Sequence, residues 1–213
     1  MVSRGRRGVS AFMVRHGSAR AAQLHVCQDL ETLSRQAAAH IVRVLRRQAR
    51  SAGRVSLALS GGMTPRRVYQ LLASDAYRRR IPWERVHLFW TDERCVPLDD
   101  PASNFGMAQR TLLSRVWMPA ANIHPIRTTG QTPASAAIAY EEVLRECFRP
   151  PRTFPTFDLI VLGLGIDGHT ASLFPSSAAL RRTRRLAVST SGGDPASAGQ
   201  RRLQKKFLCG VEK

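Results

Sequence analysis

Short apolar runs alternate with longer amphipathic stretches along most of this chain. The runs are rich in Val, Leu, Ile and aromatic residues, as buried strands are, and they end in glycine or polar residues. They occupy residues 23–27, 55–59, 86–90, 122–126, 157–162 and 186–190. Strands that alternate with helices are typical of an α/β fold with a mostly parallel sheet covered by helices on both faces. With 213 residues and 43% apolar content, we expect one doubly wound, Rossmann-like domain.

Three points along the chain carry signals for the start of a helix. Asp29 can cap a helix in which apolar residues recur every three or four positions. This predicted stripe is Leu30, Leu33, Ala37, Ile41, Leu45 and Ala49. Thr64 before Pro65, and Thr132 before Pro133, each place a capping residue ahead of a proline at the first helical position. We therefore expect helices to begin at these three points.

The most distinctive stretch is FDLIVLGLGIDGHTASLFP, at residues 157–175. An apolar run breaks into glycines that permit a tight turn, and residues 170–174 can then start a helix. The turn presents Asp167 and His169 two positions apart. An imidazole titrates near neutrality, so one at the carboxyl end of a sheet is suited to proton transfer. Taken alone, the segment is equally compatible with an ordinary turn whose histidine has a structural partner.

The same glycines also satisfy the spacing of a dinucleotide-binding fingerprint. That site needs a following strand that ends in an acidic residue about twenty positions on. Only residues 186–190 could form this strand, and Asp194 lies past its end. We therefore disfavour a dinucleotide cofactor.

A candidate phosphate site follows the run at 55–59. Ser60, Gly61, Gly62 and Thr64 would combine two glycines, two hydroxyls and the free N–H groups of a helix start. No Gly-Lys-Ser/Thr follows, so this is not the loop of a nucleoside triphosphatase. A simple capped turn is the alternative.

Charged residues follow the run at 86–90. Asp92, Glu93 and Arg94 lead into a loop that reaches Asn104. Arg94 can form an ion pair with a neighbouring carboxylate, which is the commoner arrangement. It can also present its fixed fork of donors to a phosphate or a developing oxyanion.

Taken together, these segments resemble the 6-phosphogluconolactonases. The matching motifs are SGGMTP at 60–65, WTDER at 90–94, DDPASN at 99–104 and GLGIDGHTASLFP at 163–175, in the family's order. The glucosamine-6-phosphate isomerase/deaminase branch shares the Gly-x-Asp-Gly-His core, but the other motifs have the lactonase form. The resemblance covers residues 21–203, between a basic extension at 1–20 and an atypical tail at 204–213. Gln204 stands where the family has Thr, so we expect the family's C-terminal strands and helix to be missing.

The resemblance implies hydrolysis of 6-phosphoglucono-δ-lactone to 6-phosphogluconate in the oxidative pentose phosphate pathway, with neither metal nor organic cofactor. His169 would be the general base for water, Asp167 would orient the imidazole or substrate hydroxyls, and Arg94 would stabilise the charge on the tetrahedral intermediate. The phosphate would bind at Ser60, Gly61, Gly62 and Thr64. The other expected substrate contacts are Asp92, Glu93, Asn104, Gly165, Gly168 and Arg202.

The formal charge of +18 introduces a function of a different class, which is binding of nucleic acid. The arginines are scattered through every segment, however, and no basic run carries interleaved aromatic residues. We therefore expect no specific nucleic-acid partner. An inactive relative of the same fold and an isomerase/deaminase remain the alternatives within the family.

The termini and the cysteines bear on location. Residues 1–20 hold five arginines and no acid, which fits a transit peptide, a solvated extension or a start upstream of Met13. No run of about twenty apolar residues is present, so we expect no membrane span. Cys27, Cys95, Cys147 and Cys209 form no CxxC pair, which favours a reduced cytoplasmic protein. We expect a monomer or a weak homodimer that acts on a small molecule.

Overall fold

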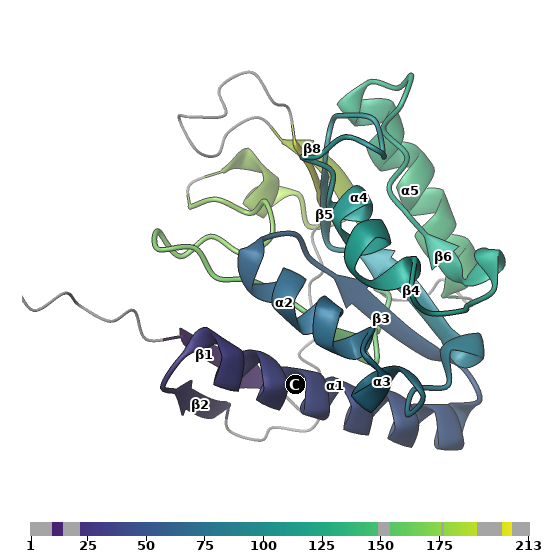
Figure 1. Cartoon of the computed structure of the whole chain (residues 1–213). Coiled ribbons are helices and arrows are strands. Elements are labelled where there is room, and N and C mark those ends of the chain that lie inside the picture. The colour runs from purple at the N-terminus through teal and green to yellow at the C-terminus, as the bar shows by residue number, and fades with distance from the viewer. Residues whose placement is uncertain (1–9, 15–21, 149–153, 176, 191–201, 206–213) are drawn as a thin grey trace, which may run out of the picture.

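A four-stranded parallel sheet forms the centre of the computed structural model, which describes residues 10–14, 22–148, 154–175, 177–190 and 202–205. The strand order is β6 (Ile123–His124), β4 (Val86–Trp90), β3 (Val55–Leu59) and β7 (Leu159–Ile160). Helices α1 (Leu30–Ala52), α2 (Met63–Leu72), α3 (Asp75–Arg78) and α4 (Asn104–Ala108) lie on one side, and α5 (Pro133–Cys147) lies on the other (Figure 1). The predicted α/β fold with a mostly parallel sheet is confirmed.

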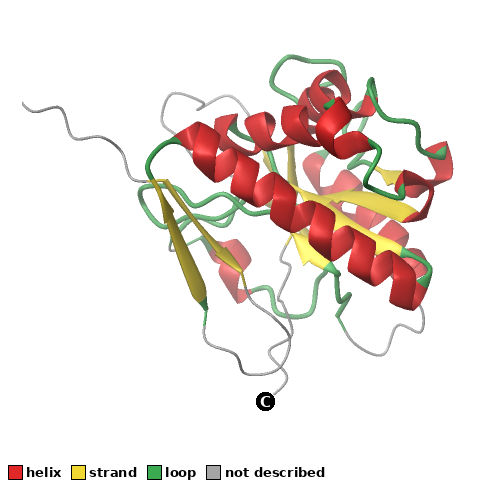
Figure 2. Ribbon diagram, turned by 60° about the horizontal axis from the view of Figure 1, so that its bottom comes forward, coloured by secondary structure: helices red, strands yellow, loops and turns green. Residues whose placement is uncertain are grey.

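Two of the predicted strands do not join this sheet. β2 (Gln23–Cys27) pairs antiparallel with β1 (Ser10–Val14), and Figure 2 shows this pair apart from the parallel sheet, beside α1. β8 (Ala187–Thr190) belongs to an antiparallel sheet of order β5-β9-β8, with β5 at Asp92–Arg94 and β9 at Arg202–Lys205. The pattern identified both strands correctly but assigned them to the wrong sheet, because apolar alternation does not specify a partner. β1 lies within the expected extension, and β9 spans the expected boundary at 203.

Two other strands are shorter than predicted. The ladder of β6 covers two residues of the predicted run at 122–126, and that of β7 covers two of the run at 157–162. Pairing continues one step beyond β7, since the Val161 N–H donates to the Ala58 carbonyl at 2.9 Å. The short helical turns between these elements lie at Trp83–Arg85, Gln109–Leu113, Ala120–Asn122 and Ala178–Arg181.

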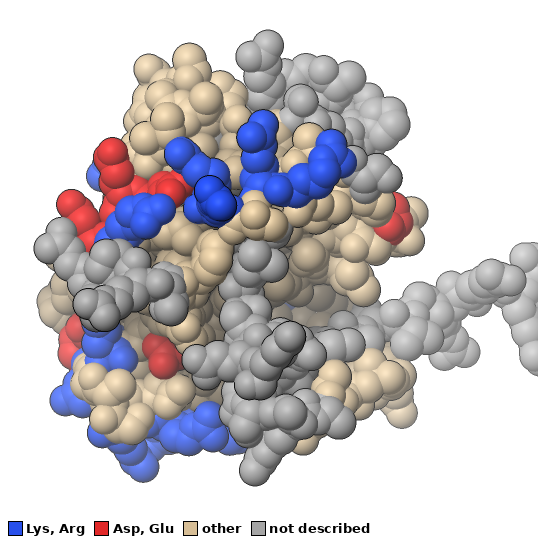
Figure 3. All heavy atoms as spheres, turned by 180° about the vertical axis from the view of Figure 1, so that it is seen from behind, with Lys and Arg blue, Asp and Glu red and all other residues tan. Residues whose placement is uncertain are grey.

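Basic side chains are spread over several elements. Seen from behind the view of Figure 1, Lys and Arg form a band across one half of the molecule and a second group at its lower end (Figure 3). Four arginines lie on the exposed side of α1, at Arg43, Arg46, Arg47 and Arg50. This distribution follows the scattered arginines of the sequence.

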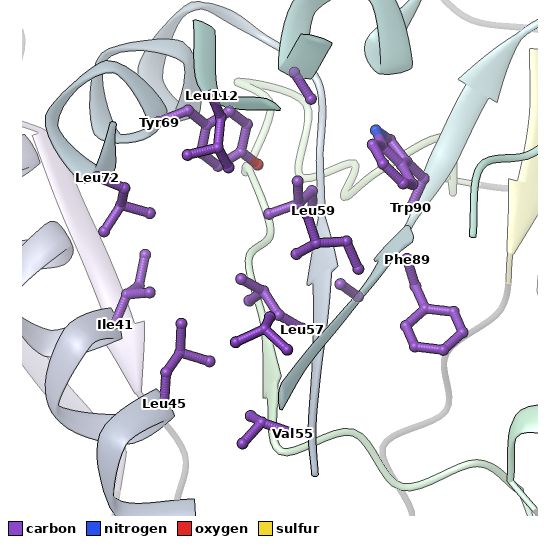
Figure 4. Packing of buried hydrophobic residues seen from close by; sticks show 14 of the residues in the cluster. Ile41, Leu45, Val55, Leu57, Leu59, Tyr69, Leu72, Phe89, Trp90 and Leu112 are labelled. Atoms are coloured by element: carbon purple, nitrogen blue, oxygen red, sulfur yellow. The ribbon is translucent and has the colours of Figure 1, made fainter. Parts of the chain in front are cut away.

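The core lies where β3 and β4 meet α1 and α2. All five residues of β3 are buried, as expected of a central parallel strand. Leu57 and Leu59 turn toward α1 and α2, and Phe89 of β4 turns the other way (Figure 4). The parallel register pairs Leu57 with Leu88, so the apolar layer against the two helices is continuous across both strands.

Of the three helix starts predicted from a capping residue, two are confirmed. The Asp29 carboxylate accepts from the Thr32 N–H at 2.7 Å, and the Thr132 hydroxyl accepts from the Ser135 N–H at 3.1 Å ahead of Pro133. The third is wrong, because α2 begins at Met63 with Gly62 as its cap. Gly62 has a φ of 110°, which glycine adopts readily, so the chain enters the helix before Thr64 is reached.

The buried face of α1 differs slightly from the predicted stripe. Leu33, Ile41, Leu45 and Ala49 are buried as expected, together with Ala38, Val42 and Val44, which the stripe did not include. Leu30 is 41% exposed, because it is the first residue of the helix and lies at its end. Within the described part of the chain, no helix has both the length and the apolar character that crossing a bilayer requires.

The two ends of this stripe provide a matched test of the core. Leu45→Ala should lower the free energy of unfolding by about 2–5 kcal/mol, because a fully buried side chain leaves a cavity. Leu30→Ala should change it by only about 0.5 kcal/mol, since much of that side chain is already in water. Urea unfolding of both variants measures the difference, and equal losses would contradict the packing described for α1.

Candidate active site

Three polar segments follow the carboxyl ends of strands in the parallel sheet. From β3 the chain passes to β4 and then to β6, and it returns to β7 on the opposite side of β3. Such a reversal of strand order leaves a crevice outside the carboxyl ends of the strands, where open α/β sheets bind ligands. The segment 60–65 follows β3, 91–94 follows β4 and 163–169 follows β7. The predicted motifs are therefore neighbours in the fold.

The turn after β3 is held by Tyr69 of α2. The Ser60 N–H donates to the Tyr69 hydroxyl at 3.0 Å, and that hydroxyl donates to the Ser60 carbonyl at 2.9 Å. Burial raises the pKa of Tyr69, which keeps the hydroxyl protonated. This role of Tyr69 was not predicted, because the residue lies among the apolar positions of α2. The result is a fixed turn immediately before the start of that helix.

Ser60 itself has an unused hydroxyl. The residue is only 3% exposed, and its Oγ has no hydrogen-bond partner among the described residues. A buried hydroxyl without a partner costs free energy. It lies beside the N-terminus of α2, whose free N–H groups favour an anion. Thr64 is exposed in the first turn of that helix.

Glu93 fastens the loop between β5 and α4. It is fully buried, and its oxygens accept from the N–H groups of Asn104 at 2.7 Å and Phe105 at 2.8 Å and from the Ser103 hydroxyl at 3.1 Å. The N–H of Arg94 also donates to it, at 2.8 Å. Burial raises the pKa of Glu93, and the N–H donors oppose that shift. Glu93 was expected to contact the substrate, but its oxygens are occupied by the protein's own loop.

Asn104 joins the segments after β3 and β4. Its amide nitrogen donates to the Asp92 carbonyl at 2.9 Å and to the Asp92 carboxylate at 3.1 Å, and its oxygen accepts from the Arg94 guanidinium. A Cβ at Gly61 would overlap the Asn104 side chain, so only glycine fits there. Arg94 also donates to the Ala102 carbonyl at 2.9 Å. In the described part of the chain, Arg94 forms no ion pair with Asp92 or Glu93, so the simple ion-pair interpretation is wrong.

In the loop after β7, the side chains of Asp167 and His169 are hydrogen-bonded to each other. The carboxylate lies 2.5 Å from the imidazole Nδ1 and accepts from the His169 N–H at 3.2 Å. These bonds, the backbone one first, lower the pKa of Asp167. Gly165 donates to the His169 carbonyl at 2.8 Å, and Gly168 has a φ of 83°. The Phe174 ring lies 4.7 Å from the imidazole, centre to centre.

The predicted helix after this loop does not form. Thr170 instead bridges Leu164 and Leu173, which closes a turn, and the next helical turn is at Ala178–Arg181. The N–H groups of a helix start are therefore not available next to His169.

A cavity of about 1000 Å³ opens between α2 and the loop that carries Arg94. Its lining includes Gly62 and Arg94, with further arginines at 66, 67, 110 and 115. Asp167 and His169 do not line it. Arg202 of β9 pairs with Arg94 in the antiparallel ladder, so its backbone lies next to the site. Among the described residues, no group of three or more His, Cys, Asp or Glu has the arrangement of a metal site.

A doubly wound α/β domain with a histidine loop and a glycine turn at its switch point is a common frame for small-molecule sites. The family model for glucosamine-6-phosphate isomerases/6-phosphogluconolactonase matches residues 28–203, and the chain belongs to this family.

Several relatives carry the same kind of name. The 6-phosphogluconolactonase of Synechocystis is 48% identical over 145 residues, which is 67% of this chain and 59% of the relative. That of Mycobacterium tuberculosis is 34% identical over 78% of this chain and 68% of its own length. The crystal structure of the Thermotoga maritima 6-phosphogluconolactonase matches with a TM-score of 0.70 at 31% identity, over 83% of this chain and 74% of that one. The chain thus spans about three fifths of the Synechocystis relative.

Replacing the buried carboxylate tests the role assigned to Glu93. Glu93→Gln should lower the free energy of unfolding by about 1–3 kcal/mol, because an amide NH2 then meets N–H donors. Because burial raises the pKa of Glu93, its titration contributes stability that is fully present below the ordinary value of 4.5 and is lost as pH rises through the folded pKa. The advantage of the native protein over the variant should therefore be larger below that value than at neutral pH.

Denaturant titrations across this pH range measure the advantage. The control is Glu84→Gln, whose carboxylate is exposed and should matter by only about 0.5 kcal/mol. An advantage that grew toward neutral pH would show that the hydrogen bonds outweigh the burial.

Proposed function

We propose that this site hydrolyses 6-phosphoglucono-δ-lactone to 6-phosphogluconate, as part of the pentose phosphate pathway. The observation that carries the proposal is the Asp167–His169 pair in the loop after β7, at the switch point that also carries the glycine turn after β3. The names of the relatives support the substrate. Because the chain spans only part of their length, activity of this chain requires direct measurement.

The pair defines which imidazole nitrogen would act. Asp167 lies against Nδ1, and its lowered pKa keeps it ionised as a hydrogen-bond acceptor. Nδ1 then carries the proton, which leaves Nε2 as the basic atom. Asp167 acts through His169, so we assign to it the positioning of the imidazole.

The reaction then needs one base and one stabiliser of charge. Nε2 of His169 would take a proton from water while the water oxygen bonds to the lactone carbonyl carbon. The resulting oxyanion would be stabilised by a fixed cation, for which Arg94 is the candidate. As the intermediate collapses, the ring C–O bond breaks and the leaving oxygen takes the proton from the imidazolium. The products are a carboxylic acid, which releases its remaining proton to solvent to give the carboxylate, and a hydroxyl, so no electron acceptor is required.

The substrate phosphate would bind at the start of α2. Ser60 offers a buried hydroxyl with no partner among the described residues, and Gly62 leaves room for a ligand to approach the backbone. Gly61, whose Cβ side is filled by Asn104, would contribute through its backbone. Thr64 and the cavity arginines would add donors from the exposed side. We propose Asn104, Gly165 and Gly168 as residues that shape the site, and Arg202 as a further basic contact. A cytoplasmic location, a monomeric or weakly dimeric state and the lack of a specific nucleic-acid partner stay predictions.

The decisive variant removes the imidazole. His169→Ala should lower kcat on freshly generated 6-phosphoglucono-δ-lactone by about 10²–10⁴-fold, which is the usual contribution of a general base. The rate is measured above spontaneous hydrolysis, and His25→Ala on exposed β2 is the control that should retain activity. A folded native chain that binds 6-phosphogluconate without turnover would identify an inactive relative. Turnover of glucosamine 6-phosphate instead would identify an isomerase/deaminase.

Two glycines of the histidine loop offer a sharper comparison. A Cβ at Gly165 would overlap the His169 ring, whereas a Cβ at Gly163 meets nothing within 4 Å. Gly165→Ala should therefore lower kcat by about 10²-fold through displacement of the imidazole, and Gly163→Ala should leave it near the native value. Steady-state kinetics of both variants measures the contrast, and equal rates would show that the loop does not set the position of His169.

A further inference from the structure

A buried hydrogen bond joins β5 to the histidine loop, by which we mean the segment 163–173 that carries His169. The Ser172 hydroxyl donates to the Asp92 carboxylate at 2.5 Å. Ser172 is fully buried and Asp92 is 5% exposed. The loop ahead of it faces solvent, with Leu164 81% exposed and Ile166 fully exposed. Ser172 is therefore the point at which an otherwise exposed loop enters the interior, three residues after His169.

The Asp92 carboxylate is shared between the two halves of the site. One oxygen accepts the hydrogen bond of the Ser172 hydroxyl, and the other accepts from the Asn104 amide at 3.1 Å. Asn104 in turn holds Arg94 and packs on Gly61. Asp92 thus connects the loop of His169, the proposed base, to Arg94, the proposed cation. Through Asn104 it also connects both to the proposed phosphate turn at residues 60–64.

The backbone between His169 and Ser172 is strained. Ala171 has a φ of 51°, and it is the only non-glycine residue of the described part of the chain with a positive φ. An alanine in this region costs free energy and persists only where its surroundings hold it. One restraint is the Leu173 N–H, which donates to the Thr170 carbonyl at 2.8 Å, and the other is the bond from Ser172 to Asp92.

We infer that Ser172 and Asp92 are positioning residues for His169. Their hydrogen bond holds the strained turn against β5 and so fixes where the imidazole lies relative to Arg94 and the phosphate turn. Asp92 was expected to contact the substrate, but both of its carboxylate oxygens are engaged within the protein, and its role is to set this geometry. The inference about catalysis rests on the proposed function, whereas the inference about the loop does not.

Ser172→Ala tests the tether. In the native chain and this variant, kcat and KM for the lactone are measured beside hydrogen exchange of the loop amides. We expect kcat to fall about 10–100-fold with KM within about threefold, because the phosphate turn is untouched while the base is misplaced. The amides of Gly165 and Gly168 should exchange faster. Ser177→Ala is the matched control, since that hydroxyl caps a neighbouring turn, and it should move neither readout.

A second variant keeps the test open if Ser172→Ala does not fold. Asp92→Asn preserves shape but replaces one acceptor oxygen by an NH2, so it should also speed exchange of the loop amides and lower kcat. The double variant should lose little more than either single one, because both remove the same bond.

Native exchange rates in both variants would overturn the inference, as would a KM increase without loss of kcat. If the native chain itself lacks lactonase activity, the proposed function fails. In that case faster loop exchange in Ser172→Ala alone would still support the tether, and unchanged exchange would overturn it.

Discussion

The buried carboxylate of Glu93 holds the loop that connects the polar segments at the carboxyl ends of the parallel strands. A carboxylate in the interior is tolerated only when its oxygens receive enough donors. Here they come from the first turn of α4, from Ser103 and from the N–H of the next residue, Arg94. This single group therefore fixes both ends of the loop between β5 and α4. Asn104 and Arg94 owe their positions to it.

Further contacts connect the loop held by Glu93 to the other segments of the candidate site. Asn104 rests on Gly61, Asp92 reaches Ser172, and Tyr69 closes the turn after β3. Two of these links are hydrogen bonds of buried side chains, and the third is a packing contact. Together they hold the segments that follow β3, β4 and β7 against one another.

Local features of the sequence predicted the local parts of this structure. Asp29 and Thr132 cap helices because capping depends on a few adjacent residues, and the apolar run at 55–59 identified the central strand. The motifs after three strands marked the site because parallel strands end at one edge. The partners of β2 and β8 were missed because β1 lies in the segment expected to be an extension, and because apolar alternation does not specify which strands pair. Gly62 displaced Thr64 as the cap of α2, since its positive φ admits an earlier start. Ser172 lies within the quoted motif and Tyr69 in an apolar stripe, but neither could be given a role, because each role depends on a hydrogen-bond partner that is distant or unremarkable in the sequence.

The position of β7 has a consequence for how the chain acquires its structure during synthesis. β3 and β4 can pair early, but β7, the second neighbour of β3, comes much later in the chain. Until residues 159–160 emerge, β3, which is apolar except for Ser56, is an edge strand with unpaired backbone groups. Open apolar edges recruit other chains. The strand that leads into the proposed phosphate-binding turn is therefore open to misassembly in the nascent protein, and its pairing is complete only when the loop that carries His169 is about to be made.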